Sequence, residues 1–222
     1  MLMRRGTRRS FAVSALAVAL AIAGCGSGAT QDANEPSGLY PVQVASASFP
    51  SFQRLAQHSR LVIKVRNIGR KTIPDVMVTI CNVTCTYPAP VGEGTSVAAF
   101  AQYLDMPNLA SHSRQVWIVD KPPGPCGYSC VNGGAGAYVT AMANTWAGGS
   151  LKPGASVTFT WGVTAVAAGR HVVAWEISAS QYGKARAVLP DGSIPRGVFA
   201  VRIAQAPAQS YVNDAGQVVQ LP

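Results

Sequence analysis

Apolar and polar residues alternate along several short stretches of this chain, which predicts β-strands. An alternation of period two sets one face of a strand against a core and the other face in water. The longest alternation covers residues 156–165, and a second follows over residues 171–177. We therefore expect Trp161 and Trp175, each in register with the other apolar side chains of its run, to lie in the core. Further strands are predicted near Tyr40 and at residues 61–66, 76–80, 114–119 and 197–204.

Turn-forming residues separate these predicted strands. The chain has 22 Gly and 15 Pro, and only 12% of its residues are charged, a composition typical of short strands joined by loops. Only residues 97–104 suggest a helical period, over one short segment. Many short alternating strands with turns between them predict an all-β protein of two packed antiparallel sheets, a β-sandwich.

The first 24 residues have the features of a signal peptide. Four arginines at positions 4, 5, 8 and 9 precede an apolar run at residues 11–23, which is too short to span a bilayer comfortably. The run ends in Ala21-Ile22-Ala23-Gly24-Cys25 and resembles the lipobox of bacterial lipoproteins. This resemblance implies cleavage before Cys25 and attachment of diacylglycerol to Cys25. Two acyl chains give stable anchoring, so we expect a mature protein held on the extracytoplasmic face of the cell membrane.

The export route and the segment after the anchor are also suggested by the sequence. Residues 7–11 read TRRSF and resemble the twin-arginine export motif. An arginine-rich signal for the general secretory route fits the same residues, and both routes stay open. Residues 25–38 are small and polar, which predicts a flexible tether between the anchor and the domain.

One stretch of the expected domain resembles a known family. Residues 61–69 read LVIKVRNIG and residues 72–76 read TIPDV, a pattern of strand, Asn-x-Gly, turn and strand. It is similar to the conserved-repeat and cell-adhesion-related (CARDB-like) domains of bacterial surface proteins. The resemblance covers about residues 55–81 and 145–204, and it implies an immunoglobulin-like β-sandwich over residues 39–222. Residues 82–145 depart from the family pattern and are expected to form a long insertion.

Four cysteines remain after Cys25, and they fall into two C-x3-C motifs: Cys81 with Cys85, and Cys126 with Cys130. An even number of cysteines in an exported protein favours two disulfides, for which three pairings exist. The spacing also allows a four-cysteine zinc site. Because export places the domain in an oxidising compartment, we expect two disulfides and no bound metal. Pairing across the motifs would tie the insertion to the end of the strand at residues 77–80, whereas pairing within each motif would close two local loops.

Charge and polar residues argue against several classes of function. The net charge of +9 falls to +5 once the arginines of the signal peptide are removed, and the remaining cations are scattered along the sequence. We therefore expect no nucleic-acid partner. His58, His112 and His171 stand apart from one another, and no nucleophile, phosphate-binding or metal-binding motif accompanies them. We expect neither enzyme activity nor a cofactor.

These observations predict a membrane-anchored lipoprotein whose immunoglobulin-like domain is a non-catalytic surface module. It would serve in binding, in adhesion or in the structure of the envelope, with a protein or a glycan as its candidate ligand. The alternative is a solute-binding or metal-binding lipoprotein that uses residues 82–145 as its pocket, lined by Tyr103, Trp117 and Tyr138. Long loops on a rigid sandwich often carry binding surfaces, which keeps this alternative open.

Overall fold

The computed structural model describes residues 35–81, 99–103, 108, 113–124, 144–180 and 183–220. The segment Glu35–Pro222 forms one compact unit. The predicted signal peptide, the lipidation site Cys25 and most of the tether lie outside the described residues. Every regular element in the described part is a β-strand. No helix there is long and apolar enough to cross a membrane.

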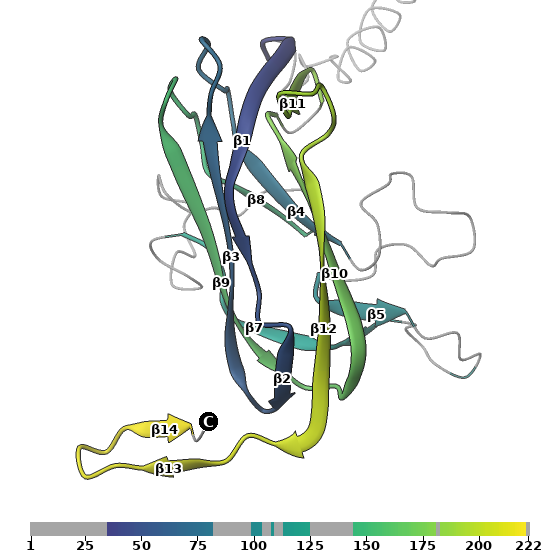
Figure 1. Ribbon diagram of the computed structural model, residues 1–222, viewed down its shortest axis with the longest axis vertical. Coiled ribbons are helices and arrows are strands. Elements are labelled where there is room, and N and C mark those ends of the chain that lie inside the picture. Colours follow the sequence, from purple (N-terminus) through teal and green to yellow (C-terminus); the bar gives the residue numbers. More distant parts are fainter. Residues whose placement is uncertain are drawn as a thin grey trace, which may run out of the picture. The chain divides into compact units, whose positions relative to one another are not determined.

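The first of two five-stranded sheets holds the N-terminal strand of the domain (Figure 1). Three of its ladders are antiparallel, whereas β1 pairs with β11 in parallel. The order of strands across the sheet is β11 (Ala185–Val188), β1 (Gly38–Ser48), β3 (His58–Asn67), β9 (Ser156–Ala165) and β7 (Trp117–Lys121).

The second sheet has the order β2 (Phe52–Leu55), β12 (Arg196–Pro207), β10 (Gly169–Ser178), β4 (Met77–Cys81) and β8 (Thr145–Ala147). Its ladders are antiparallel except for the parallel pair of β2 and β12. The expectation of purely antiparallel sheets is therefore wrong at one edge of each sheet. Successive strands of the sandwich alternate between the two sheets along the chain, and β2 and β11 are the two strands that join an edge in parallel.

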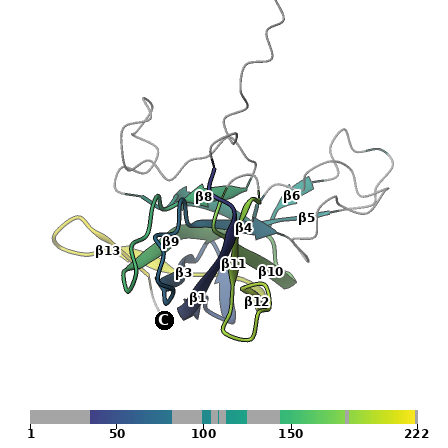
Figure 2. The same cartoon turned by 90° about the horizontal axis from the view of Figure 1, so that it is seen from above.

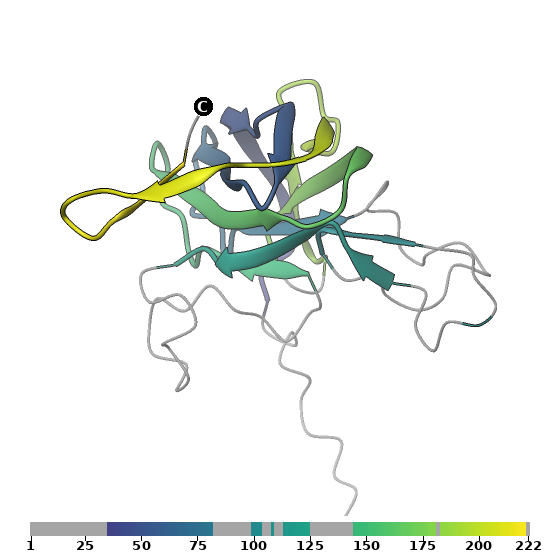
Figure 3. The same cartoon turned by 90° about the horizontal axis from the view of Figure 1, so that it is seen from below.

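Two short hairpins complete the described elements. β5 (Ala101–Tyr103) pairs with β6 (Ser113–Gln115), and β13 (Ser210–Val212) pairs with β14 (Val218–Gln220). The β13–β14 hairpin leaves the sandwich at the end of β12 (Figure 3, yellow). Its apolar side chains Tyr211, Val212 and Val218 are exposed, so it adds little to the core.

The inner faces of the two sheets form one core, as the alternation predicted. In β3 and β9 the residues Leu61, Ile63, Phe159 and Trp161 are fully buried, and Trp175 of β10 is 5% exposed. The Trp161 ring meets Trp146 at 5.3 Å between centroids, edge to face, and stacks with Phe159 at 6.1 Å. The two layers are seen end-on in Figure 2. The expected core positions of Trp161 and Trp175 are confirmed, and so is an all-β sandwich.

Two local predictions are wrong. The strand expected over residues 114–119 is divided at Val116 into β6 and β7, which belong to different sheets. The helical period expected over residues 97–104 is a turn followed by β5 in its described part. A single residue explains both, because Phe100 has a φ of +64° and its carbonyl accepts hydrogen bonds from the backbone N–H groups of Val116 and Trp117. The sharp turn at Phe100 thus replaces a helix and interrupts the strand opposite.

The Asn-x-Gly pattern after β3 has a structural cause in Asn67, which is fully buried. Its Nδ2 group donates to the carbonyl oxygens of Lys71 (2.9 Å) and Leu151 (2.8 Å), and its Oδ1 accepts from the N–H of Gly69 (2.9 Å). An asparagine supplies both donors and an acceptor at one point. The side chain therefore closes its own turn and ties it to the chain that leads into β9.

Candidate functional site

The outward face of the first sheet carries a set of exposed cations. On β3, Arg60, Lys64 and Arg66 are exposed, and at least one neighbour of each along the strand is a buried apolar residue. Lys121 of β7 and Arg186 of β11 are exposed as well, and Arg186 lies between two buried alanines. We call these five residues the basic face. The strands of this sheet contain one acidic residue, Asp120.

Hydroxyl side chains flank the central strand of the basic face. In the register of β3 and β9, Lys64 lies opposite Thr158 and Arg66 lies opposite Ser156. On the other side, Lys64 pairs with Ser46 of β1. Small hydroxyl residues leave the long cationic side chains uncovered and can themselves donate hydrogen bonds. The result is a broad polar surface with a positive centre.

Gly162 of β9 brings basic side chains together at one end of this face. It lies opposite Arg60 of β3 and Lys121 of β7. A Cβ atom at this position would lie 3.1 Å from Cε1 of His58 and 3.2 Å from Cβ of Lys121. The missing side chain thus lets His58 and Lys121 close over β9 from both sides.

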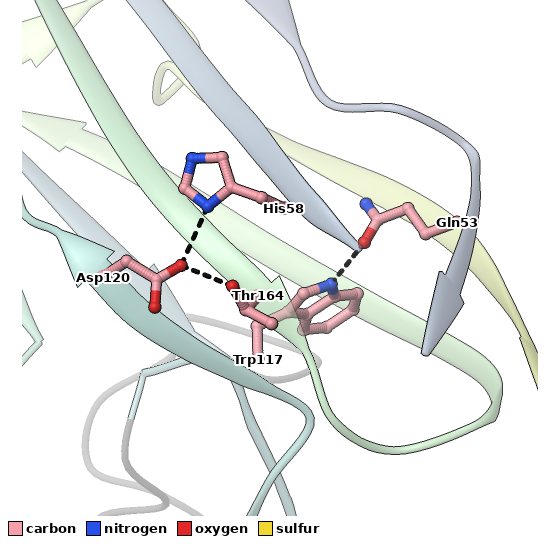
Figure 4. A network of polar contacts seen from close by, with 5 residues as sticks. All are labelled: Gln53, His58, Trp117, Asp120 and Thr164. Atoms are coloured by element: carbon pink, nitrogen blue, oxygen red, sulfur yellow. Dashed lines mark hydrogen bonds and ion pairs between the residues drawn. The ribbon is translucent and has the colours of Figure 1, made fainter. Parts of the chain in front are cut away.

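His58 is held in place by a polar network (Figure 4). Its Nδ1 lies 3.0 Å from Oδ2 of Asp120, and the Thr164 hydroxyl donates to the same oxygen at 2.6 Å. The His58 and Asp120 side chains are 50% and 38% exposed. Because the hydroxyl donates to the carboxylate and not to the imidazole, the contacts orient the ring and leave no activated nucleophile in this network.

A second polar pair lies beneath the same end of the sheet and is buried. The Trp117 indole N–H donates to Oε1 of Gln53 at 2.7 Å, and Nε2 of Gln53 donates to the Pro50 carbonyl at 3.1 Å. Gln53 is fully buried and Trp117 is 1% exposed. These bonds satisfy polar groups inside the sandwich. Trp117, expected to line a pocket in the alternative function, is therefore a core residue that joins the edge strands of the two sheets.

The outward face of the second sheet has a different charge pattern. Its exposed cations are Arg170, Arg196 and Arg202, and Arg196 lies opposite Glu176 in the register of β10 and β12. Burial raises the pKa of Glu176 above its usual range, and the nearby Arg196 opposes that shift. One of the three cations therefore faces a carboxylate. Phe52 and Val198, both more than half exposed, add apolar surface.

Of the four cysteines after Cys25, the described residues include Cys81 alone. Cys81 ends β4 and is disulfide-bonded. Cys85, Cys126 and Cys130 lie outside the described residues, so the pairing and the number of bridges stay predictions. Among the residues that the structure describes, no three His, Cys, Asp or Glu side chains are grouped as they would be around a metal ion.

Most of the proposed pocket also lies outside the described part of the chain. Tyr138 lies outside the described residues, and so do most of residues 82–145. Tyr103 is in β5, but its side chain is not described. His112 is likewise outside the described residues. His171 is the third residue of β10 and is half-buried, with Nε2 within hydrogen-bond distance of the carbonyl of Ala167 at 3.1 Å.

Sequence reasoning missed the basic face because it treated the cations as scattered. A signal was present, since positions 60, 64 and 66 share one face of a strand whose other face is apolar. Lys121 and Arg186 belong to the basic face because of the order of strands in the sheet, which the sequence does not reveal. The contact of His58 with Asp120 joins residues that are 62 positions apart, and no sequence motif predicts it.

Comparisons with known proteins add similarities of fold. No protein family and no curated protein matches the sequence. Similar solved structures include α2-macroglobulin of Escherichia coli, with 15% identity, a TM-score of 0.39, and coverage of 77% of this chain and 7% of that one. They also include the CARDB domain of a Pyrococcus furiosus protein, with 10% identity, a TM-score of 0.39, and coverage of 75% and 96%. A crystal structure of that domain in complex with di-metal ions has a TM-score of 0.37. All three scores are below 0.5, so the description of the fold rests on the sheets of this chain.

Proposed function

We propose that this chain is an extracytoplasmic lipoprotein that is anchored through Cys25 and displays a non-catalytic, CARDB-like immunoglobulin domain as a surface-binding module. The observation that carries the proposal is the closed core of the sandwich. The large side chains Trp117, Trp161 and Phe159 fill the space between the sheets and are at most 1% exposed. Ligands therefore have the outer faces and the connecting loops to bind, and not the interior.

The anchoring part of the proposal rests on the sequence. Small residues before Cys25 follow an apolar run of signal-peptide length. The described domain begins its first strand at Gly38, which leaves twelve positions between Cys25 and that strand. A polar chain of that length reaches on the order of 20 Å, enough to hold the domain just above a membrane.

Replacement of Cys25 by alanine tests the anchor. We expect the wild-type chain to incorporate labelled fatty acid and to accumulate as a precursor when globomycin blocks the lipoprotein peptidase. The Cys25→Ala variant should remain unlabelled and uncleaved by that peptidase. Ser27→Ala, two residues further on, is the matched control and should behave like the wild type. If wild type and Cys25→Ala are processed alike and neither carries the label, the lipoprotein assignment is wrong.

A further inference from the structure

We propose that the basic face binds the surface of an anionic phospholipid bilayer, with the first sheet lying against the headgroups. The first observation is the excess of positive charge. Five exposed cations, Arg60, Lys64, Arg66, Lys121 and Arg186, share the sheet with Asp120 alone. That carboxylate already contacts His58 and Thr164. Among the described residues, neither Arg60 nor Lys64 has an acidic partner.

The second observation is the breadth of the charged surface. Residues along a strand rise about 3.3 Å each, so Arg60 and Arg66 lie roughly 20 Å apart along β3. Neighbouring strands are about 4.8 Å apart, so the distance from β11 to β7 is also roughly 20 Å. A surface of this size can face several phosphate groups at once. A small anion would use only one or two of these cations.

The third observation concerns the hydroxyl and apolar side chains that lie between and beside the cations. Thr158 and Ser156 supply hydroxyl donors beside Lys64 and Arg66. Leu39 of β1 is 62% exposed and Ile118 of β7 is 51% exposed, and these strands stand on opposite sides of β3. Apolar side chains beside basic residues are typical of surfaces that lie at the boundary between headgroups and acyl chains.

The place of the first strand in the sheet favours a bilayer over a soluble polyanion. The strand that follows the tether is β1, which belongs to this same sheet. This step rests on the proposed function, since it requires a lipid at Cys25. An anchor within about 20 Å of β1 keeps the basic face at a high effective concentration near the headgroups, so weak contacts suffice.

Flotation with lipid vesicles tests the basic face without the anchor. Glu35–Pro222 is a compact unit by itself, so the chain from residue 26 onward can be made without a lipid. We expect it to bind vesicles of equal parts phosphatidylglycerol and phosphatidylcholine and not vesicles of phosphatidylcholine alone. Binding should weaken at least tenfold between about 0.1 M and about 1 M salt, where the screening length falls from roughly 10 Å to roughly 3 Å.

Charge-removing variants assign the binding to one face. Arg60→Gln with Lys64→Gln should weaken binding on the order of tenfold or more. Arg170→Gln with Arg202→Gln removes the same charge from the second sheet and should leave binding within about twofold. Equal loss in both pairs, or no binding to the anionic vesicles, would overturn the proposal. Tighter binding of soluble polyphosphate than of vesicles, lost in the Arg60/Lys64 pair, would assign the face to a polymer and also overturn it. Lipidation is measured separately, so failure of the anchor and failure of the face are distinguishable.

Discussion

Asn67 shows how much of this fold depends on one polar side chain. Its three side-chain hydrogen bonds join the turn after β3 to Leu151, and Ile73 and Leu151 form an antiparallel bridge beside it. Two of the three bonds go to groups within four residues and the third crosses 84 positions. The Asn-x-Gly pattern could therefore be predicted as a turn, but its long-range partner could not.

Replacement of Asn67 by alanine should lower the free energy of unfolding by about 2–4 kcal/mol. The substitution removes three hydrogen bonds, each of which contributes about 0.5–1.5 kcal/mol. The Leu151 carbonyl keeps its bond from the N–H of Ile73 at 2.9 Å, so it is not left without a partner. Chemical denaturation measures the change. Gln43→Ala, on the exposed face of β1, is the control and should change the free energy of unfolding by less than about 0.5 kcal/mol. An unchanged midpoint for Asn67→Ala would show that water or a neighbouring group replaces the lost bonds.

At the scale of elements, strands of five residues or more could be predicted, and most strands of three or four residues could not. β3, β9 and β10 each have ten residues, long enough for several cycles of alternation between buried and exposed positions. β2, β8 and β11 have three or four residues, which is too few to show a period. Their positions are fixed by pairing with long strands, as in the addition of β2 to β12.

The pairing of β10 with β12 depends on a glycine. Trp175 lies opposite Gly197, and a Cβ atom on Gly197 would overlap Cζ2 of Trp175 and lie 2.7 Å from its Cε2. Gly197→Ala should therefore cost about 1–3 kcal/mol, the usual range for overpacking, and lower the thermal midpoint. Val198→Ala, one residue further and 59% exposed, tests whether any change in this strand has the same effect. A midpoint for Gly197→Ala equal to that of the wild type would mean that the indole ring moves away freely.

At the scale of the whole molecule, the sandwich was predictable and the surface was not. The alternation of apolar residues predicted two packed sheets because burial of apolar side chains is the dominant favourable term in folding. The basic face, in contrast, requires strands from residues 38 to 188 to be placed side by side. Charges contribute little to which fold forms, so their arrangement appears only once the strands are in order.

The disulfide prediction concerns the exported chain as a whole. Cys81 is disulfide-bonded, and we expect the remaining cysteines after Cys25 to leave no free thiol in the exported protein. Mass spectrometry of the unreduced chain after thiol alkylation measures this directly, and metal analysis accompanies it. Reduction should lower the free energy of unfolding by about 2–4 kcal/mol for each bridge. Alkylated thiols together with one equivalent of zinc would instead support the four-cysteine metal site.

The place of β1 in its sheet has a mechanical consequence. β1 is an inner strand, paired in parallel with β11 on one side and antiparallel with β3 on the other. A pull on the N-terminus acts along β1, and the hydrogen bonds of its antiparallel ladder run across that direction. The bonds are then loaded in shear and share the force, instead of opening one after another as in a zipper. A domain that is held by its N-terminus against moving liquid would therefore stretch its tether before its first strand slips.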